Sequence, residues 1–169
     1  MAKNIDALDY LDHPDKYPPA NLCVVFGDEP YLKHEAISAL RKIALGDDDG
    51  DVSLSVFSDG EAAWRDVMDS LATVAMFGGG RRLTLVENAD SFVTEHRGAL
   101  EDYIEKPKPG VLLLEVKKWA ANTKLYKKVA ESGLPIECKQ PTPAALRKWL
   151  VNRARKKHGT KFDSAAADL

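Results

Sequence analysis

Residues 22–40 read LCVVFGDEPYLKHEAISAL, an uninterrupted apolar run followed by a short turn and an amphipathic helix. The run Leu22–Phe26 contains no polar residue, which is typical of a parallel strand covered on both faces. Gly27 ends the strand, and Pro30 suits the first turn of a helix, with Asp28 or Glu29 as its cap. The stretch predicts a strand–turn–helix unit whose helix buries apolar residues at three-to-four spacing, namely Leu32, Ala36, Ala39, Leu40 and Ile43.

The same alternation of strand and helix continues to residue 138. Upstream, Ile5, Leu8 and Leu11 predict one short helix, which ends at the proline-containing run HPDKYPPA. Strands joined by helices require right-handed crossovers and a mainly parallel sheet. Residues 1–140 are therefore predicted to form a three-layer α/β domain around a five-stranded sheet. After the first strand, the predicted strands are 53–57, 83–86, 111–116 and 134–138, and the predicted helices are 61–73, 91–104 and 123–131.

A boundary follows at the run KQPTPAAL. Thr142 suits the N-cap of a new helix and Pro143 its first position. The helix places Leu146, Trp149, Leu150 and Ala154 on one stripe, with its basic residues elsewhere. The sequence stops at FDSAAADL as another helix begins, so we expect residues 141–169 to be the truncated start of a second, helical domain.

Composition places the chain among ordinary globular proteins. It has 169 residues, 44% of them hydrophobic and 30% charged, with a formal net charge of −2. No apolar run approaches the ~18 residues of a membrane span, and the start MAKNIDALDYLDH lacks the apolar core of a secretory signal. Cys23 and Cys138 each fall in a predicted buried strand, which suits free thiols in a reducing compartment. We expect a cytoplasmic protein without membrane contact.

The turn after the first strand is where a doubly wound sheet usually binds its ligand. A phosphate-binding loop needs several glycines, a lysine and a hydroxyl residue. The turn Gly27–Pro30 has one glycine, and the Asp28 and Glu29 carboxylates stand where phosphates would lie. The turn is thus a degenerate nucleotide loop, and we expect no nucleotide cofactor.

No pattern of residues predicts catalysis or metal binding. The four histidines lie far apart in the sequence, without a carboxylate or cysteine at metal-ligand spacing. There is no G-x-S-x-G motif, and the serines have no neighbouring histidine to activate them. We therefore expect no catalytic residue and no metal.

Two adjacent apolar residues, Met76 and Phe77, follow a predicted helix and precede three glycines. A turn readily directs one apolar side chain inward but less readily two neighbours, so an exposed apolar partner site is one interpretation. The alternative is that Phe77 covers the helix end against the core. Arg81 and Arg82 flank the segment, and they would either pair with acidic groups of a partner or be solvated.

The stretch from Lys139 to Phe162 contains eight basic residues and no acidic residue. One interpretation is nucleic-acid contact through the helix 147–157, and the other is a solvated helix face. Trp119 presents a similar choice, because it would either stack on a base or seal a sheet edge. The candidate DNA-binding residues are Arg147, Arg153, Arg155, Lys156 and Lys157.

Three short motifs in this order resemble the delta-subunit family of bacterial DNA polymerase III. The first is G-D-E-P-Y-L at Gly27–Leu32, followed by Glu35. The second is A-M-F-G-G-G-R-R-L at residues 75–83, where the family has a small residue, Leu-Phe-Gly and a later arginine. The third is Cys138-x-x-Pro141 before a helix that carries Leu146, Trp149 and Arg153. The resemblance covers nearly the whole chain, and the order and spacing of the three motifs carry it.

The resemblance implies an AAA+-like fold, related to P-loop NTPases, in which residues 141–169 begin a lid domain. It also implies a non-enzymatic subunit of the polymerase complex, since Asn88 follows Glu87 where active relatives carry Asp-Glu, and Lys117 stands where a polar sensor is expected.

By the same resemblance, Met76 and Phe77 would insert into a pocket of the sliding clamp, the beta subunit, with Arg81 and Arg82 beside them. Other clamp-loader subunits would join through a C-terminal collar that lies outside this sequence, and primed DNA is a further candidate partner. The alternatives are a nucleic-acid-binding module acting through helix 147–157 and an α/β NTPase.

Overall fold

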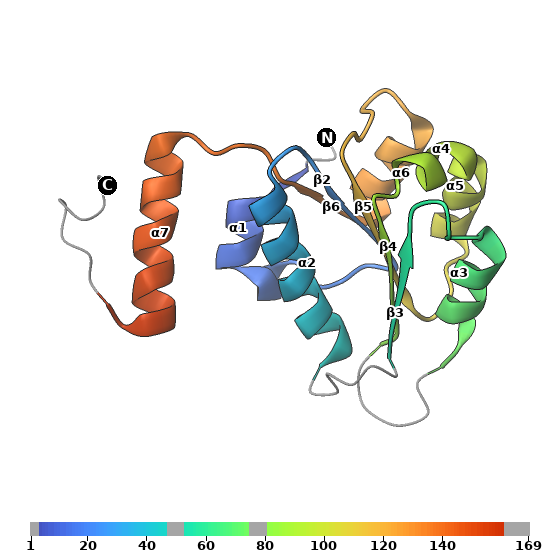
Figure 1. Cartoon of the computed structure of the whole chain (residues 1–169), viewed down its shortest axis with the longest axis horizontal. Helices are drawn as coiled ribbons and strands as arrows, with labels where there is room; N and C mark the ends of the chain where they lie inside the picture. Colours follow the sequence, from blue (N-terminus) through green and yellow to red (C-terminus); the bar gives the residue numbers. More distant parts are fainter. Residues whose placement is uncertain (1–3, 47–52, 75–80, 161–169) are drawn as a thin grey trace.

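The computed structural model describes residues 4–46, 53–74 and 81–160. They form a parallel sheet of six strands in the order β1-β6-β2-β5-β4-β3, with helices on both faces (Figure 1). This confirms the predicted three-layer α/β class. The strands are β1 (Ile5–Asp6), β2 (Leu22–Phe26), β3 (Leu54–Ser58), β4 (Leu83–Glu87), β5 (Val111–Val116) and β6 (Leu134–Glu137). The helices are α1 (Ala7–Asp12), the 3-10 helix Pro14–Lys16, α2 (Pro30–Leu45), α3 (Trp64–Ala72), α4 (Asp90–Glu95), α5 (Arg97–Glu105), α6 (Lys124–Ser132) and α7 (Pro143–His158).

Strand β2 lies in the middle of the sheet and is buried along its whole length. It pairs with β5 on one side and with β6 on the other. Its side chains alternate between two cores, since Cys23 and Val25 join the core under α1 and α2, while Val24 and Phe26 join the core under α3 to α6. Burial on both faces is the reason for its continuous apolar sequence.

Two predicted elements differ from the structure. The sheet has six strands where five were predicted, because residues Ile5–Asp6 pair with β6 before α1 begins. Asp6 then caps α1 by accepting a hydrogen bond from the Leu8 N–H at 3.0 Å. The predicted helix 91–104 is divided into α4 and α5, because the backbone of His96 leaves the helical region (φ −109°, ψ 22°).

Helix α7 lies beside α1 at one side of the molecule (Figure 1). Its predicted start is confirmed, because the Thr142 hydroxyl accepts a hydrogen bond from the Ala145 N–H at 3.2 Å. Its predicted stripe is covered only in part, since Trp149 is 3% exposed whereas Leu146 and Leu150 are 38% and 48% exposed. The division of the chain into two domains at residue 140 stays a prediction. No helix in the described ranges combines the length and the apolarity that crossing a bilayer requires.

Candidate functional site

The predicted clamp-binding pair, Met76 and Phe77, lies outside the described residues. The structure does describe how the chain approaches this segment. Helix α3 ends at Ala72, and Thr73 takes an extended conformation (φ −69°, ψ 122°). The next side chain, Val74, is 66% exposed, the highest value among the exposed large hydrophobic residues of the described chain. The apolar sequence run 74–77 therefore begins with Val74, whose side chain the core does not cover.

Both flanks of segment 75–80 are fixed at one place, the backbone of Gly110 before β5. On the α3 side, the Gly110 N–H donates to the Leu71 carbonyl at 3.1 Å. On the β4 side, the Arg81 guanidinium donates to the Gly110 carbonyl at 3.4 Å, and the Arg81 N–H donates to the Ala44 carbonyl at 2.9 Å. The described residues on both sides of segment 75–80 are consequently anchored at the start of β4 and β5.

Arg81 has a role that the sequence did not suggest. Besides Gly110, its guanidinium donates to the carbonyls of Pro109 and Pro19, both at 3.2 Å. The neighbouring Arg82 lies 3.4 Å from the Ser55 hydroxyl, to which it donates. Arg81 thus links several backbone segments directly after residues 75–80. This arrangement differs both from a solvated arginine and from an arginine that points toward a partner.

The degenerate nucleotide loop is packed against the chain that leaves β6. Gly27 has φ +127°, and a Cβ atom added there would lie 2.1 Å from the Cys138 carbonyl oxygen. That carbonyl accepts a hydrogen bond from the Glu29 N–H at 3.1 Å, and the Cys138 N–H donates to the Phe26 carbonyl at 2.7 Å. Glu29 is the N-cap residue of α2, although its carboxylate accepts no capping hydrogen bond. A backbone N–H of this turn is therefore used within the protein.

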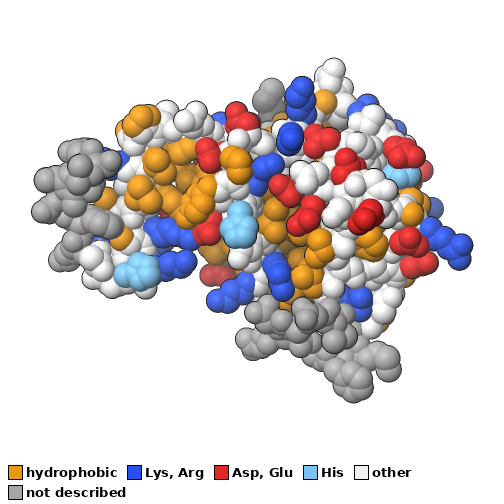
Figure 2. All heavy atoms as spheres, viewed as in Figure 1, with side chains coloured by type: hydrophobic (Ala, Val, Ile, Leu, Met, Phe, Trp, Pro, Cys, Tyr) orange, Lys and Arg blue, Asp and Glu red, His pale blue; other side chains and the backbone are white. Residues whose placement is uncertain are grey.

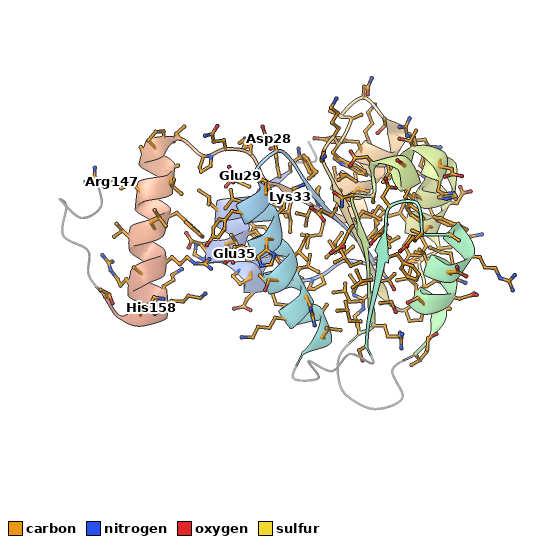
Figure 3. The ribbon with its side chains drawn as sticks, in the orientation of Figure 1. Asp28, Glu29, Lys33, Glu35, Arg147 and His158 are labelled. Atoms are coloured by element: carbon orange, nitrogen blue, oxygen red, sulfur yellow. The ribbon has the colours of Figure 1, made fainter. Side chains whose placement is uncertain are left out.

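An ion pair between a buried lysine and a half-buried glutamate lies close to this turn in the fold. Lys33 on α2 is 7% exposed, and its Nζ lies 3.3 Å from Oε1 of Glu115 on β5. Figure 3 shows Lys33 one turn along α2 from Asp28 and Glu29. Burial raises the pKa of the nearby Cys138 thiol to about 12, although the Lys33 charge acts in the opposite direction. The Lys33 amine, which is the closest to the turn in sequence, is thus paired with the Glu115 carboxylate of the sheet.

The segment after β4 is held by an aspartate that the sequence reasoning missed. Asn88, the residue after β4, lies in the left-handed region (φ 50°). The Asp90 carboxylate, in the first turn of α4, accepts hydrogen bonds from the Lys117 N–H at 3.0 and 3.1 Å and from the Lys118 N–H at 3.1 Å. The sequence signal for Asp90 was an acidic residue at the start of a helix. Its contact with Lys117 could not be read from the sequence, because it depends on β4 and β5 lying side by side in the sheet.

The basic residues of α7 separate into two groups. Arg153 forms an ion pair with Glu35 of α2 and lies over the Trp149 ring at 4.8 Å, and Lys156 donates to the Asp12 carbonyl at 3.1 Å. These two predicted DNA-binding residues hold α7 on the α/β part, so the prediction that basic residues avoid the packed face was wrong for them. The other three, Arg147, Arg155 and Lys157, are exposed, and Figure 3 shows Arg147 pointing away from the sheet.

Trp119 is half-buried against the second core. Its ring centroid lies 6.4 Å from that of Phe26 and 6.4 Å from that of Tyr126. Of the two interpretations of this residue, the packing favours a tryptophan that seals the end of the sheet. Elsewhere in ranges 4–46, 53–74 and 81–160, no three His, Cys, Asp or Glu side chains lie together as a metal site would require.

Comparison with known proteins relates the chain to a replication family. A family model described as DNA polymerase III, delta subunit, matches residues 24–139. The DNA polymerase III subunit delta of Bacillus subtilis is 32% identical over an alignment of 157 residues, and the alignment covers 86% of this chain and 45% of that protein.

Two solved structures share the fold. The DNA clamp loader delta protein of Bacillus subtilis superposes with a TM-score of 0.74 at 24% identity, covering 96% of this chain and 50% of that one. A DNA polymerase III gamma subunit-related protein from Thermotoga maritima gives a TM-score of 0.57 at 16% identity, covering 91% and 51%. The chain spans about half the length of the relatives that it matches.

Proposed function

Because the chain belongs to the DNA polymerase III delta-subunit family, we propose that it is the clamp-binding part of a clamp-loader subunit. In this proposal it binds the ring-shaped sliding clamp through segment 75–80 and favours the ring conformation in which one interface is open. The open ring is then placed on primed DNA in the cytoplasm during replication. The observation that carries the proposal is the family match over residues 24–139, a range that includes this segment.

The geometry on both sides of segment 75–80 supports the proposal. Exposed Val74 precedes Met76 and Phe77 in the sequence, and the contacts of Gly110 and Arg81 anchor the described residues that flank the segment. Anchored flanks reduce the conformational entropy that a binding segment loses when it meets its partner. Burial of two large apolar side chains in a pocket contributes ~3–6 kcal/mol, or ~10²–10⁴-fold in affinity.

Clamp opening in this proposal is driven by binding energy. A ligand shifts the equilibrium between closed and open rings only by its differential affinity for the two states. Met76 and Phe77 are therefore proposed to contact a clamp surface that differs between the two forms. Arg81 anchors the chain directly after segment 75–80, and Arg82 is proposed to contact an acidic group of the clamp beside it.

The chain itself is proposed to be non-catalytic within the polymerase complex. The backbone of turn 27–30 is hydrogen-bonded to Cys138, and Lys33 is paired with Glu115. In a complete loader, the energy for cycling would come from ATP bound to neighbouring subunits, which would associate through a collar outside this sequence.

The test is a calorimetric titration of the chain with its cognate sliding clamp, compared with the double variant Met76→Ala/Phe77→Ala. We expect the variant to lose at least ~10²-fold in affinity while keeping its circular dichroism spectrum. Val56→Ala is the matched control, because it removes a 49% exposed apolar side chain from a different surface, on β3. Clamp binding that is equal in wild type and double variant would contradict the proposed contact.

A second candidate function is nucleic-acid binding through exposed basic side chains of α7. Lys148, Arg155 and Lys157 are exposed there, and no ion pair engages them within the described residues. We expect the double variant Arg155→Glu/Lys157→Glu to weaken binding of primed DNA and to reduce its dependence on salt, measured by fluorescence anisotropy.

The control for this test is Lys106→Glu/Lys108→Glu, which makes the same change in net charge at the end of α5. If the two double variants affect DNA binding equally, only the net charge of the chain matters, and α7 is not a specific contact.

A further inference from the structure

A groove of about 500 Å³ lies where β3 ends and α3 and α4 begin. Neither segment 75–80 nor α7 contributes a residue to its described lining, and the proposed clamp contact does not use it. Figure 2 shows acidic side chains gathered over the α3 and α4 side of the molecule, at the right of the view. The groove residues that carry charge or an aromatic ring are Asp59, Glu61, Trp64, Phe92, Glu95 and His96.

Three packed rings, of which Trp64 and Phe92 are stacked, form the floor of the groove. Trp64 lies on Phe92 with ring centroids 6.0 Å apart and an interplanar angle of 23°. His96 contacts both rings, at 5.4 Å from Trp64 and 4.8 Å from Phe92. Because Phe92 is buried in the second core, the half-buried Trp64 ring is held in one orientation at the groove surface. The floor is a rigid aromatic platform.

The rim of the groove is acidic. Asp59, Glu61 and Glu95 are exposed, and the Ser91 hydroxyl donates to Oδ2 of Asp59 at 3.1 Å. None of the described residues that line the groove is a lysine or an arginine. Carboxylates around the face of an indole attract a cation, because both the charges and the ring quadrupole favour positive charge. The same charges repel the phosphates of a nucleic acid.

A second feature indicates that the ligand is an extended peptide. Strand β3 is the outermost strand, and among the described residues it pairs only with β4. Its Val56 side chain is 49% exposed. An open strand edge is a template for an added strand from another chain. Since β3 ends at Ser58, directly before Asp59, a peptide paired with β3 would reach the groove at its end.

We propose that β3 and this groove together form a docking site for an extended segment of a partner protein that carries an arginine. The backbone of the segment adds to the open edge of β3, and a side chain of the segment packs beside Val56. Its guanidinium lies over Trp64 and pairs with the rim carboxylates. Arginine suits the site better than lysine, because its planar group stacks on an indole and binds a carboxylate with two donors.

The probe for the test is a blocked peptide of alternating valine and threonine that ends in arginine, titrated into the isotope-labelled chain. A matched peptide has citrulline, a neutral group of nearly the same shape, in place of arginine. We expect chemical-shift changes at β3 and at the Trp64 indole N–H, with at least tenfold tighter binding of the arginine peptide. Equal affinity for both peptides, shifts elsewhere, or no binding at millimolar peptide would each overturn the proposal.

Two double variants distinguish the effect of the groove carboxylates on peptide affinity from the effect of the net charge of the chain. Glu61→Gln/Glu95→Gln removes two rim charges without touching the buried platform, and we expect it to lower the arginine-peptide affinity to that of the citrulline peptide. Asp66→Asn/Asp102→Asn makes the same change in net charge with exposed carboxylates that do not line the groove, and should leave the affinity unchanged. An equal effect of both double variants would refute the groove as the recognition element.

Discussion

Gly27 lies at a position that a larger residue does not fit. Its φ of +127° is unfavourable for a side chain, and an added Cβ would lie 2.1 Å from the Cys138 carbonyl oxygen. We predict that Gly27→Ala lowers the free energy of unfolding by ~2–5 kcal/mol, the sum of backbone strain and overpacking. Urea unfolding followed by circular dichroism measures the change.

The matched control for Gly27 is Gly60→Ala. Gly60 also has a positive φ, +84°, but no atom within 4 Å of the added Cβ. This variant should therefore show backbone strain alone, about 1–3 kcal/mol. An effect of Gly27→Ala that is no larger than that of Gly60→Ala would show that the turn does not pack on Cys138.

The two cysteines should make stability depend on alkaline pH. Burial raises the pKa of Cys23 and of Cys138 from 9.0 to about 12. The folded state therefore keeps both thiol protons at pH values where the unfolded chain releases them. The resulting stability is fully present below pH 9 and is lost as the pH rises from about 9 toward 12. We predict a fall of ~1 kcal/mol per thiol in the free energy of unfolding between pH 9 and pH 10.

The control for the pH prediction is the variant Cys23→Ala/Cys138→Ala, measured over the same pH range. Its core is altered, so only the pH dependence is compared. Between pH 9 and pH 10, the fall in its free energy of unfolding should be smaller than that of the wild type by ~2 kcal/mol. Identical slopes would mean that the thiols ionise equally in both states.

At the scale of elements, α7 is held on the α/β part by charged side chains. The Glu35–Arg153 pair joins α2 to α7, and both side chains are about one-fifth exposed. We predict that Glu35→Lys releases α7, because it places two cations together. A released 16-residue helix is marginally stable in water, so its amides should exchange with solvent at least tenfold faster. Hydrogen exchange read by mass spectrometry over residues 143–158 measures this.

The charge swap Glu35→Lys/Arg153→Glu should restore most of the protection, because it rebuilds the pair with the charges exchanged. Lys148→Glu is the control for a charge change on the exposed side of α7. Failure of the swap to restore protection would mean that Trp149 and Lys156, rather than the ion pair, hold the helix.

The sequence predicted those helices and strands whose signal lies within their own residues. The apolar runs of β2 and β5 and the Thr142 cap of α7 are such local signals. Strand β1 has two residues, too few to show a period, and forms because β6 is available beside it. The break at His96, whose ring lies 5.4 Å from that of Trp64, is likewise not visible in any local sequence pattern.

The features of the candidate site also divide into those that the sequence predicts and those that depend on tertiary contacts. The lost glycines and the carboxylates of turn 27–30 can be read from the sequence, but the bond from Glu29 to Cys138 joins two separate strands' ends. The basic residues of α7 were visible as candidates, whereas the partners of Arg153 and Lys156 lie 118 and 144 residues away. Sequence therefore identified the charges, and tertiary contacts decide which of them face solvent.

For the molecule as a whole, the proposed non-catalytic role requires that the α/β fold has no nucleotide site of its own. We predict that 1 mM MgATP leaves the melting temperature of the chain unchanged. A ligand at 100 times its Kd stabilises a protein by ~2.7 kcal/mol, which corresponds to a shift of roughly 5–10 °C for a chain of this size. An unchanged temperature thus excludes Kd values near 10 µM, and an ATP-binding relative run in parallel shows that the assay detects binding. A clear upward shift would mean that turn 27–30 releases Cys138 to admit phosphates, and the α/β NTPase interpretation would replace the non-catalytic one.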